Sequence, residues 1–127
     1  MTLQLSRLHQ VGGALGDREQ TSTFYREVLG IHPVATFDPP GLVFFDLDGV
    51  RLLLERDASP ATIYLWVDDI DVAVRTLKDR GVEFAAAPHR IFRDDAGTFG
   101  AAGEEEWMAF FEDPAGNSLV VATRRVG

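Results

Sequence analysis

Short apolar runs, separated by turn residues, recur along the whole chain. Runs of 4–8 residues with alternating apolar and polar or small positions are typical of strands, which we predict at 8–15, 34–37, 42–45, 50–55, 62–67 and 82–84. Two other stretches carry apolar residues every three or four positions, as amphipathic helices do. The first contains Phe24, Tyr25, Val28 and Leu29, and the second contains Ile70, Ala73, Val74 and Leu77.

Both predicted helices have start and stop signals. Asp17 precedes the first helix and Asp68-Asp69 the second, and an aspartate at this place accepts hydrogen bonds from the free amides of the first turn. Gly30 and Gly81 follow the last apolar positions, and glycine readily adopts the left-handed conformation that ends a helix.

The clearest turn in the sequence is Asp113-Pro114-Ala115-Gly116-Asn117, which lies between two apolar runs. Proline fixes φ near −65°, and glycine and asparagine tolerate positive φ, so these residues predict a tight turn between two strands. A fainter copy, Asp46-Leu47-Asp48-Gly49, separates the runs at 42–45 and 50–55. A hairpin used twice suggests a duplicated unit.

The spacing of the elements supports a duplication. Gln10 precedes the cap Asp17 by seven residues, and Thr62 precedes Asp69 by the same seven. The element order reads βαβββ twice, which predicts an α+β fold of two tandem βαβββ modules. We expect a single domain over 1–127, with module one at about 5–56 and module two at about 61–125.

The segment from His89 to Glu106 has no counterpart in the first half beyond a short turn at Asp38–Gly41. It is polar and rich in glycine, so it is either a lid over a binding site or an ordinary surface loop.

Charge and composition exclude several classes of function. The net charge of −8 disfavours nucleic acid and anionic membranes as partners, because both attract basic surfaces. The absence of cysteine excludes disulfides, thiolate metal sites and cysteine nucleophiles. We find no signal peptide and no apolar run of membrane-spanning length, so a cytoplasmic protein is expected.

Four segments, in this order, resemble those of the vicinal oxygen chelate (VOC) superfamily, the glyoxalase/bleomycin-resistance/dioxygenase group. They are Asp17 with 24–30, Val67–Asp71, Gly81–Phe84 and Asp113–Asn117. The resemblance spans nearly the whole chain and implies paired modules whose sheets form an open barrel around a cavity, with homodimers common. It implies no particular reaction, because the superfamily contains enzymes and drug-sequestering proteins alike.

Catalytic members of this superfamily place His, Gln or Glu at four inward positions, two in each module. The matching positions hold Gln10, Leu53, Thr62 and Val120 in this chain. Only Gln10 is a usual ligand type, and Thr, Val and Leu supply neither imidazole nor carboxylate. We therefore expect no metal and no other cofactor. The alternative is an irregular metal site of Gln10, Glu55 and His89.

Strand alternation predicts which residues line the cavity. Trp107 and Phe111 share a face of their strand, although the sequence does not fix which face. The predicted ligand-binding residues are Gln10, Arg51, Leu53, Glu55, Thr62, Tyr64, Trp66, His89, Trp107, Phe111 and Val120.

These residues favour a protein that binds a small, partly apolar or aromatic molecule without the usual catalytic metal. The rival hypothesis is an enzyme, a glyoxalase-like lyase, an isomerase or a dioxygenase, with an irregular metal site or with His89 or Glu55 as a weak candidate for acid/base catalysis. A third is a regulatory or structural dimer whose cavity is filled by Tyr64 and Trp66.

Overall fold

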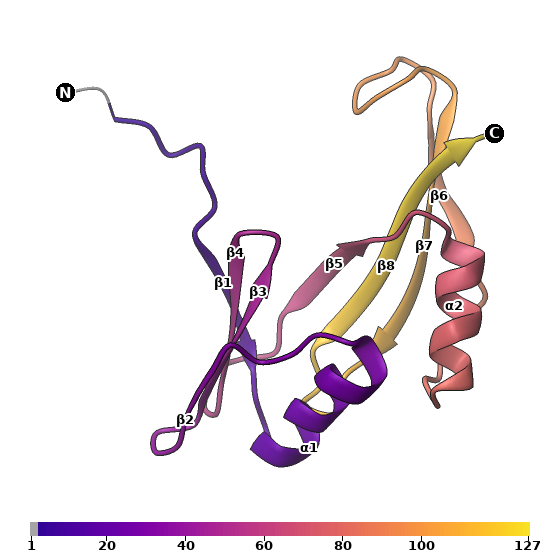
Figure 1. Ribbon diagram of the computed structural model, residues 1–127. Helices are drawn as coiled ribbons and strands as arrows, with labels where there is room; N and C mark the ends of the chain where they lie inside the picture. Colours follow the sequence, from indigo (N-terminus) through magenta and orange to yellow (C-terminus); the bar gives the residue numbers. More distant parts are fainter. Residues whose placement is uncertain (1–2) are drawn as a thin grey trace. The chain divides into compact units, whose positions relative to one another are not determined.

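The computed structural model describes residues 3–127 and divides into two compact units. Unit 1 comprises the described residues up to Ala61 together with Asp113–Asn117, and unit 2 comprises Thr62–Glu112 and Ser118–Gly127. Each unit contains a four-stranded mixed sheet and a helical segment, so the α+β fold with two βαβββ-like modules is confirmed (Figure 1). That the two units make one domain stays a prediction.

The strand order is the same in both sheets, as a duplication requires. Unit 1 has the order β1-β4-β3-β2 and unit 2 the order β5-β8-β7-β6. The first strand is parallel to its neighbour in each sheet, and the other pairs are antiparallel. The strands of unit 1 are β1 (Gln10–Ala14), β2 (Ala35–Phe37), β3 (Leu42–Leu47) and β4 (Val50–Glu55); those of unit 2 are β5 (Thr62–Trp66), β6 (His89–Asp94), β7 (Glu104–Glu112) and β8 (Ser118–Val126).

The helical segment of unit 1 begins as α1 (Arg18–Thr23) and continues as the π-helix η1 (Phe24–Leu29). Asp17 caps it as predicted, because its Oδ1 accepts a 2.8 Å hydrogen bond from the Gln20 amide. The segment ends at Gly30, whose φ of 73° is left-handed. Tyr25 stacks on Phe45 of β3 with ring centroids 4.8 Å apart, and this contact places the helical segment on one face of the sheet.

Helix α2 (Ile70–Asp79) covers one face of the unit 2 sheet, along β7 and β8. The side chain of Asp69 accepts from the Val72 amide and caps the helix, as expected. At the other end, the Val82 amide donates to the Leu77 carbonyl and the Gly81 amide to that of Lys78, which is the Schellman pattern. This pattern explains why the strand predicted at 82–84 does not form. Val82 is held by the end of the helix instead of by the sheet.

The segment 89–106 also differs from the prediction. Half of it is strand, because β6 occupies His89–Asp94 and β7 begins at Glu104. Only the short connection 95–103 remains as loop. Its course is held by Asp94, whose carboxylate accepts hydrogen bonds from the amides of Thr98 and Phe99.

The turn Asp113–Asn117 connects two strands of unit 2 but packs within unit 1. Asn117 is fully buried, and its amide side chain accepts from the Ala14 and Ala61 amides and donates to the Ala14 carbonyl. The Tyr25 hydroxyl donates a 2.7 Å hydrogen bond to Asp113. The turn is therefore part of the buried core of unit 1. No helix of residues 3–127 is long and apolar enough to cross a membrane.

Candidate ligand-binding faces

Each sheet has one face under its helical segment and one open face. Paired residues on neighbouring strands point to the same side, so the register assigns each side chain to a face. In unit 2 the face under α2 is apolar and largely buried. Its members include Ile63, Leu65, Trp107, Ala109, Phe111, Leu119, Val121 and Thr123.

The open face of unit 2 carries two rows of side chains that cross the sheet. Starting from β5, the first row consists of Tyr64, Val120 and Phe110, and the second of Trp66, Ala122, Met108 and His89. We call these seven residues the aromatic face. Four of the residues predicted to bind a ligand lie together here, namely Tyr64, Trp66, His89 and Val120.

The aromatic face has large side chains around a small floor. Tyr64 is 60% exposed and Trp66 is 62% exposed, whereas Val120 between Tyr64 and Phe110 is buried. The indole Nε1 of Trp66 donates to Asp68 at 3.1 Å, which fixes the ring at the edge of the sheet. Exposed aromatic side chains grouped over small residues are typical of binding surfaces.

Trp107 and Phe111 lie on the opposite face of the sheet, under α2. The guanidinium of Arg125 lies 3.9 Å from the Trp107 ring centroid and pairs with Asp71 of the helix at 3.0 Å. Phe111 is buried and packs edge-to-face against Phe84, with 5.1 Å between ring centroids. Both residues have the register of the face under α2, so we do not place them with the residues of the aromatic face.

A cluster of charges lies on the same open face, beyond the aromatic rows. Arg124 is paired with Asp94 at 2.8 Å and with Glu104 at 3.4 Å, while its Nη1 lies 3.9 Å from Glu106. The amides of Phe99 and Thr98, together with Arg124, hold the pKa of Asp94 below its usual value. Among the described residues, the buried Nη1 of Arg124 has no hydrogen-bond partner, so it remains a donor for an acceptor group.

The geometry of His89 fixes its tautomer. Its Nδ1 lies 3.2 Å from the carbonyl oxygen of Ala87, which only accepts, so Nδ1 carries the proton. The ring stacks on Phe110 with 6.0 Å between centroids. In the neutral imidazole with this tautomer, Nε2 is the acceptor nitrogen.

The open face of unit 1 contains Gln10, Arg51, Leu53 and Glu55, whereas the remaining predicted residue, Thr62, lies on the open face of unit 2 and pairs with Ser118. Gln10 is paired with Arg51 across the strands, and Arg51 lies over the Phe44 ring at 5.7 Å. The His9 Nε2 lies 2.9 Å from Nη2 of Arg51. His9 precedes the first residue of β1, so strand alternation does not govern it.

The donor set does not fit a divalent metal. Of the four family positions, Thr62, Leu53 and Val120 lack a strong donor, and Gln10 lies beside the cationic Arg51. Glu55 pairs with Ala14, four residues along β1 from Gln10, so the two Cα positions are roughly 13 Å apart. In residues 3–127 no three His, Asp or Glu side chains are grouped to hold an ion. The buried Oε1 of Gln10 has no described hydrogen-bond partner and remains free to accept one.

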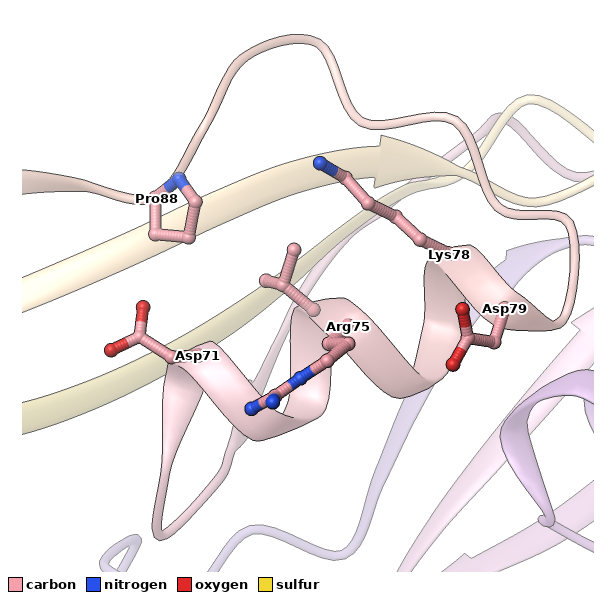
Figure 2. Close-up of a pocket in the computed structure, with 6 residues that line it drawn as sticks. Asp71, Arg75, Lys78, Asp79 and Pro88 are labelled. Atoms are coloured by element: carbon pink, nitrogen blue, oxygen red, sulfur yellow. The ribbon is translucent and has the colours of Figure 1, made fainter.

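Two shallow pockets lie outside these faces. One, of about 300 Å³, is lined by charged residues of α2 and by Pro88 from the segment before β6 (Figure 2). The other, of about 370 Å³, lies beside the start of α1, where Asp38 pairs with Arg18 and Arg56. Both are open surface hollows, and neither contains a predicted site residue.

Several residues of the open faces were missed by our sequence analysis, namely Phe44, Asp94, Met108, Phe110 and Arg124. A signal for Phe110 was present in the turn Asp113–Asn117. Counting outward from this turn pairs Glu112 with Ser118 and hence Phe110 with Val120. No comparable local signal identifies Asp94, because its partner Arg124 is 30 residues away.

The chain belongs to the Glyoxalase/Bleomycin resistance protein/Dioxygenase superfamily, whose family model matches residues 7–121. The resemblance noted in the sequence is thereby confirmed. No protein of curated function matches the chain.

Solved structures of the same fold include proteins with different roles. A member of the superfamily from Sphaerobacter thermophilus is 25% identical, with a TM-score of 0.71 over 94% of this chain and 98% of that chain. An antibiotic-binding protein from a Streptomyces species is 20% identical, with a TM-score of 0.66 over 94% of this chain and 97% of that one. A lactoylglutathione lyase from Agrobacterium tumefaciens is 20% identical, with a TM-score of 0.69 over 92% of each chain. The last two likenesses establish the fold alone.

Proposed function

We propose that this protein binds a small, partly apolar or aromatic molecule on the aromatic face of unit 2, without a divalent metal. The observation that carries the proposal is the pair of largely exposed rings, Tyr64 and Trp66, beside the small floor of Val120 and Ala122. A flat apolar ligand stacked there gains aromatic contacts and removes apolar surface from water.

Polar groups at the border of the aromatic face would orient such a ligand. The Nη1 of Arg124 lies 3.9 Å from Glu106 but has no hydrogen-bond partner among the described residues, so it can donate to a ligand acceptor. The Nε2 of a neutral His89 ring can accept from a ligand donor. A mostly apolar surface with a few placed polar groups is the usual composition of a small-molecule site. The antibiotic-binding relative has a role of the same kind.

The two tryptophans of the chain provide a direct test, because only one of them lies on the aromatic face. The Trp107→Phe variant retains Trp66 as its only indole, and the Trp66→Phe variant retains only Trp107. A panel of small aromatic compounds is first screened by thermal shift, since a ligand at 100 times its Kd stabilises the folded state by about 2.7 kcal/mol. Each stabilising compound is then titrated against both variants by tryptophan fluorescence.

We expect a ligand to change the emission of Trp66 in Trp107→Phe and to leave the emission of Trp107 in Trp66→Phe unchanged. Stabilising ligands that leave Trp66 unaffected, or no stabilisation across the panel, would refute the proposal. Elemental analysis of protein purified without chelator should find substoichiometric metal. A stoichiometric transition ion that is lost on Gln10→Ala would overturn the metal-free part.

One observation favours a second candidate function, metal-free acid/base chemistry. His89 lies on the same face as the proposed ligand, and with Nδ1 donating to Ala87 the Nε2 of its neutral ring can accept a proton. In that case a bound compound would be converted during incubation with the protein, as seen by mass spectrometry, and His89→Gln would abolish conversion while binding persists. Unchanged ligand after prolonged incubation would leave sequestration as the function.

A further inference from the structure

The chain that connects α2 to β6 leaves a hollow against the helix. We call its residues 82–88 the return segment. The Val82 amide donates to the Leu77 carbonyl at the end of α2 at 3.0 Å, and the Ala85 amide donates to the Phe110 carbonyl of β7 at 2.9 Å. These two bonds hold the return segment in place, so the hollow is formed before a ligand arrives, which lowers the cost of binding.

The hollow is the pocket of about 300 Å³ that Figure 2 shows. Five of its six lining residues belong to α2, and the sixth is Pro88 of the return segment. All six belong to unit 2, so the walls of the pocket come from one unit alone. Its volume is at the lower end of the range for ligand sites, which suits a small molecule.

The pocket carries charges of both signs, and they are separated along the helix. Asp71 and Lys78 are seven residues apart, which corresponds to about two turns or roughly 10.5 Å along α2. Figure 2 shows both side chains extending from α2 on the side of Pro88. Val74 lies between them in the sequence, is 4% exposed and gives the pocket an apolar floor. One end is therefore acidic, the other basic and the middle apolar.

Both charged groups keep the capacity to bind a ligand. Asp71 Oδ2 accepts from Arg125 Nη1 at 3.0 Å, which orients the carboxylate, and Oδ1 has no hydrogen bond among the described residues. In residues 3–127 the Lys78 ammonium has no ion-pair partner. The lining also contains Arg75 and Asp79, so its two acids and two bases give no net charge.

We propose that this pocket binds a free apolar amino acid, which is a small zwitterion. Its ammonium group donates to Asp71, its carboxylate accepts from Lys78, and its side chain packs on Val74. The two charges of an α-amino acid lie roughly 3 Å apart, and a charge-assisted hydrogen bond of about 2.8 Å at each end extends the span to about 8–9 Å. Two helical turns accommodate this length.

A ligand with a single charge fits the pocket less well than a zwitterion. An anion attracted by Lys78 is repelled by the carboxylate of Asp71, and a cation attracted by Asp71 is repelled by Lys78. The pocket shares no residue with the aromatic face. The proposal is therefore independent of ligand binding on the aromatic face.

The first test follows the backbone amides by two-dimensional NMR while L-leucine is added. We expect saturable shifts confined to residues 71–79 and 82–87, with a dissociation constant of about 1–10 mM for a ligand of this size. Leucinamide has the same shape but only the ammonium charge, and 4-methylpentanoate has only the carboxylate charge. Each should bind about ten-fold more weakly than leucine, because one charge-assisted hydrogen bond is missing. Alanine, valine and phenylalanine complete the panel.

The second test assigns each charge of the ligand to its residue. In Lys78→Gln the affinity for leucine should fall to that for leucinamide, and in Asp71→Asn it should fall to that for 4-methylpentanoate. Lys78→Arg should retain binding, as should the control Glu83→Gln at an exposed residue outside the pocket. The spectra themselves show whether each variant is folded.

Three results would overturn the proposal. The first is the absence of saturable shifts with any of the four amino acids. The second is a wild type that binds leucinamide or 4-methylpentanoate as tightly as leucine. The third is a folded Lys78→Gln or Asp71→Asn variant that binds leucine with the affinity of the wild type.

Discussion

The hydrogen bond between Tyr25 and Asp113 provides a test of how the turn Asp113–Asn117 stabilises unit 1. Tyr25 is 1% exposed, and its hydroxyl donates to Asp113 Oδ2 at 2.7 Å. Tyr25→Phe removes this bond and keeps the ring that packs on Phe45. A hydrogen bond to a charged group contributes about 1.5–3 kcal/mol. Because Asn117 Nδ2 also donates to the same oxygen, we expect a loss of about 2 kcal/mol at pH 7.

The destabilisation caused by Tyr25→Phe should depend on pH, and this dependence is the more specific test. Burial, and then the charge and hydrogen bond of Asp113, raise the pKa of Tyr25 above its usual value of 10.0. The folded state therefore keeps the proton while the unfolded state releases it above pH 10. The contribution of Tyr25 is fully present below pH 10 and falls above it by about 1.4 kcal/mol per pH unit.

Urea unfolding of the wild type and Tyr25→Phe between pH 7 and 11 measures both effects. The difference in the free energy of unfolding should be constant up to pH 9 and should narrow by about 1.4 kcal/mol at pH 11. Tyr64→Phe, at an exposed tyrosine, is the control and should follow the wild type across the range. A difference for Tyr25→Phe that does not change with pH would refute the reasoning.

Two further variants test buried polar groups. Asn117→Ala leaves the Ala14 and Ala61 amides without an acceptor and should lower the free energy of unfolding by about 3 kcal/mol. The control Asp57→Ala, at an exposed residue, should change it little. Equal urea midpoints for Asn117→Ala and the wild type would contradict this role of Asn117. The depressed pKa of Asp94 stabilises the folded state above pH 3.8, the usual pKa of an aspartate, and this stability is lost as the pH falls below that value. Acid unfolding followed by circular dichroism should therefore depend less steeply on pH for Asp94→Asn than for the wild type, with Asp95→Asn as the control. Superimposable curves for Asp94→Asn and the wild type would disprove the contribution.

The elements with strong local signals could be predicted from the sequence. The caps Asp17 and Asp69 and the stop at Gly30 all have the predicted conformations. The strand predicted at 82–84 was wrong, because the end of α2 competes with the sheet for Val82. The alternation of apolar and polar residues predicts a strand without regard to whether a neighbouring helix end binds the same backbone groups.

The binding faces could be predicted only in part. Strand alternation places Tyr64 and Trp66 on one side of β5, as observed. The same argument puts Trp107 and Phe111 on one side of their strand but does not determine which face of the sheet that side is. The face of those residues follows from contacts with Asp71 and Phe84, which lie more than 25 residues away in the chain. For the same reason the role of Tyr25 could not be foreseen, since its partner Asp113 is 88 residues distant.

The buried turn Asp113–Asn117 also determines when unit 1 can complete its fold during synthesis of the chain. Unit 1 contains residues up to Ala61, yet the side chain that bonds Ala14 and Ala61 is 103 residues from Ala14. When residues 1–61 have emerged from the ribosome, the strands of unit 1 are complete, but its core residues Asp113–Asn117 have not yet been synthesised. Unit 1 completes its fold only after nearly all of unit 2 has been made. A fragment that ends at Ala61 should accordingly be cleaved by proteases that the full chain resists.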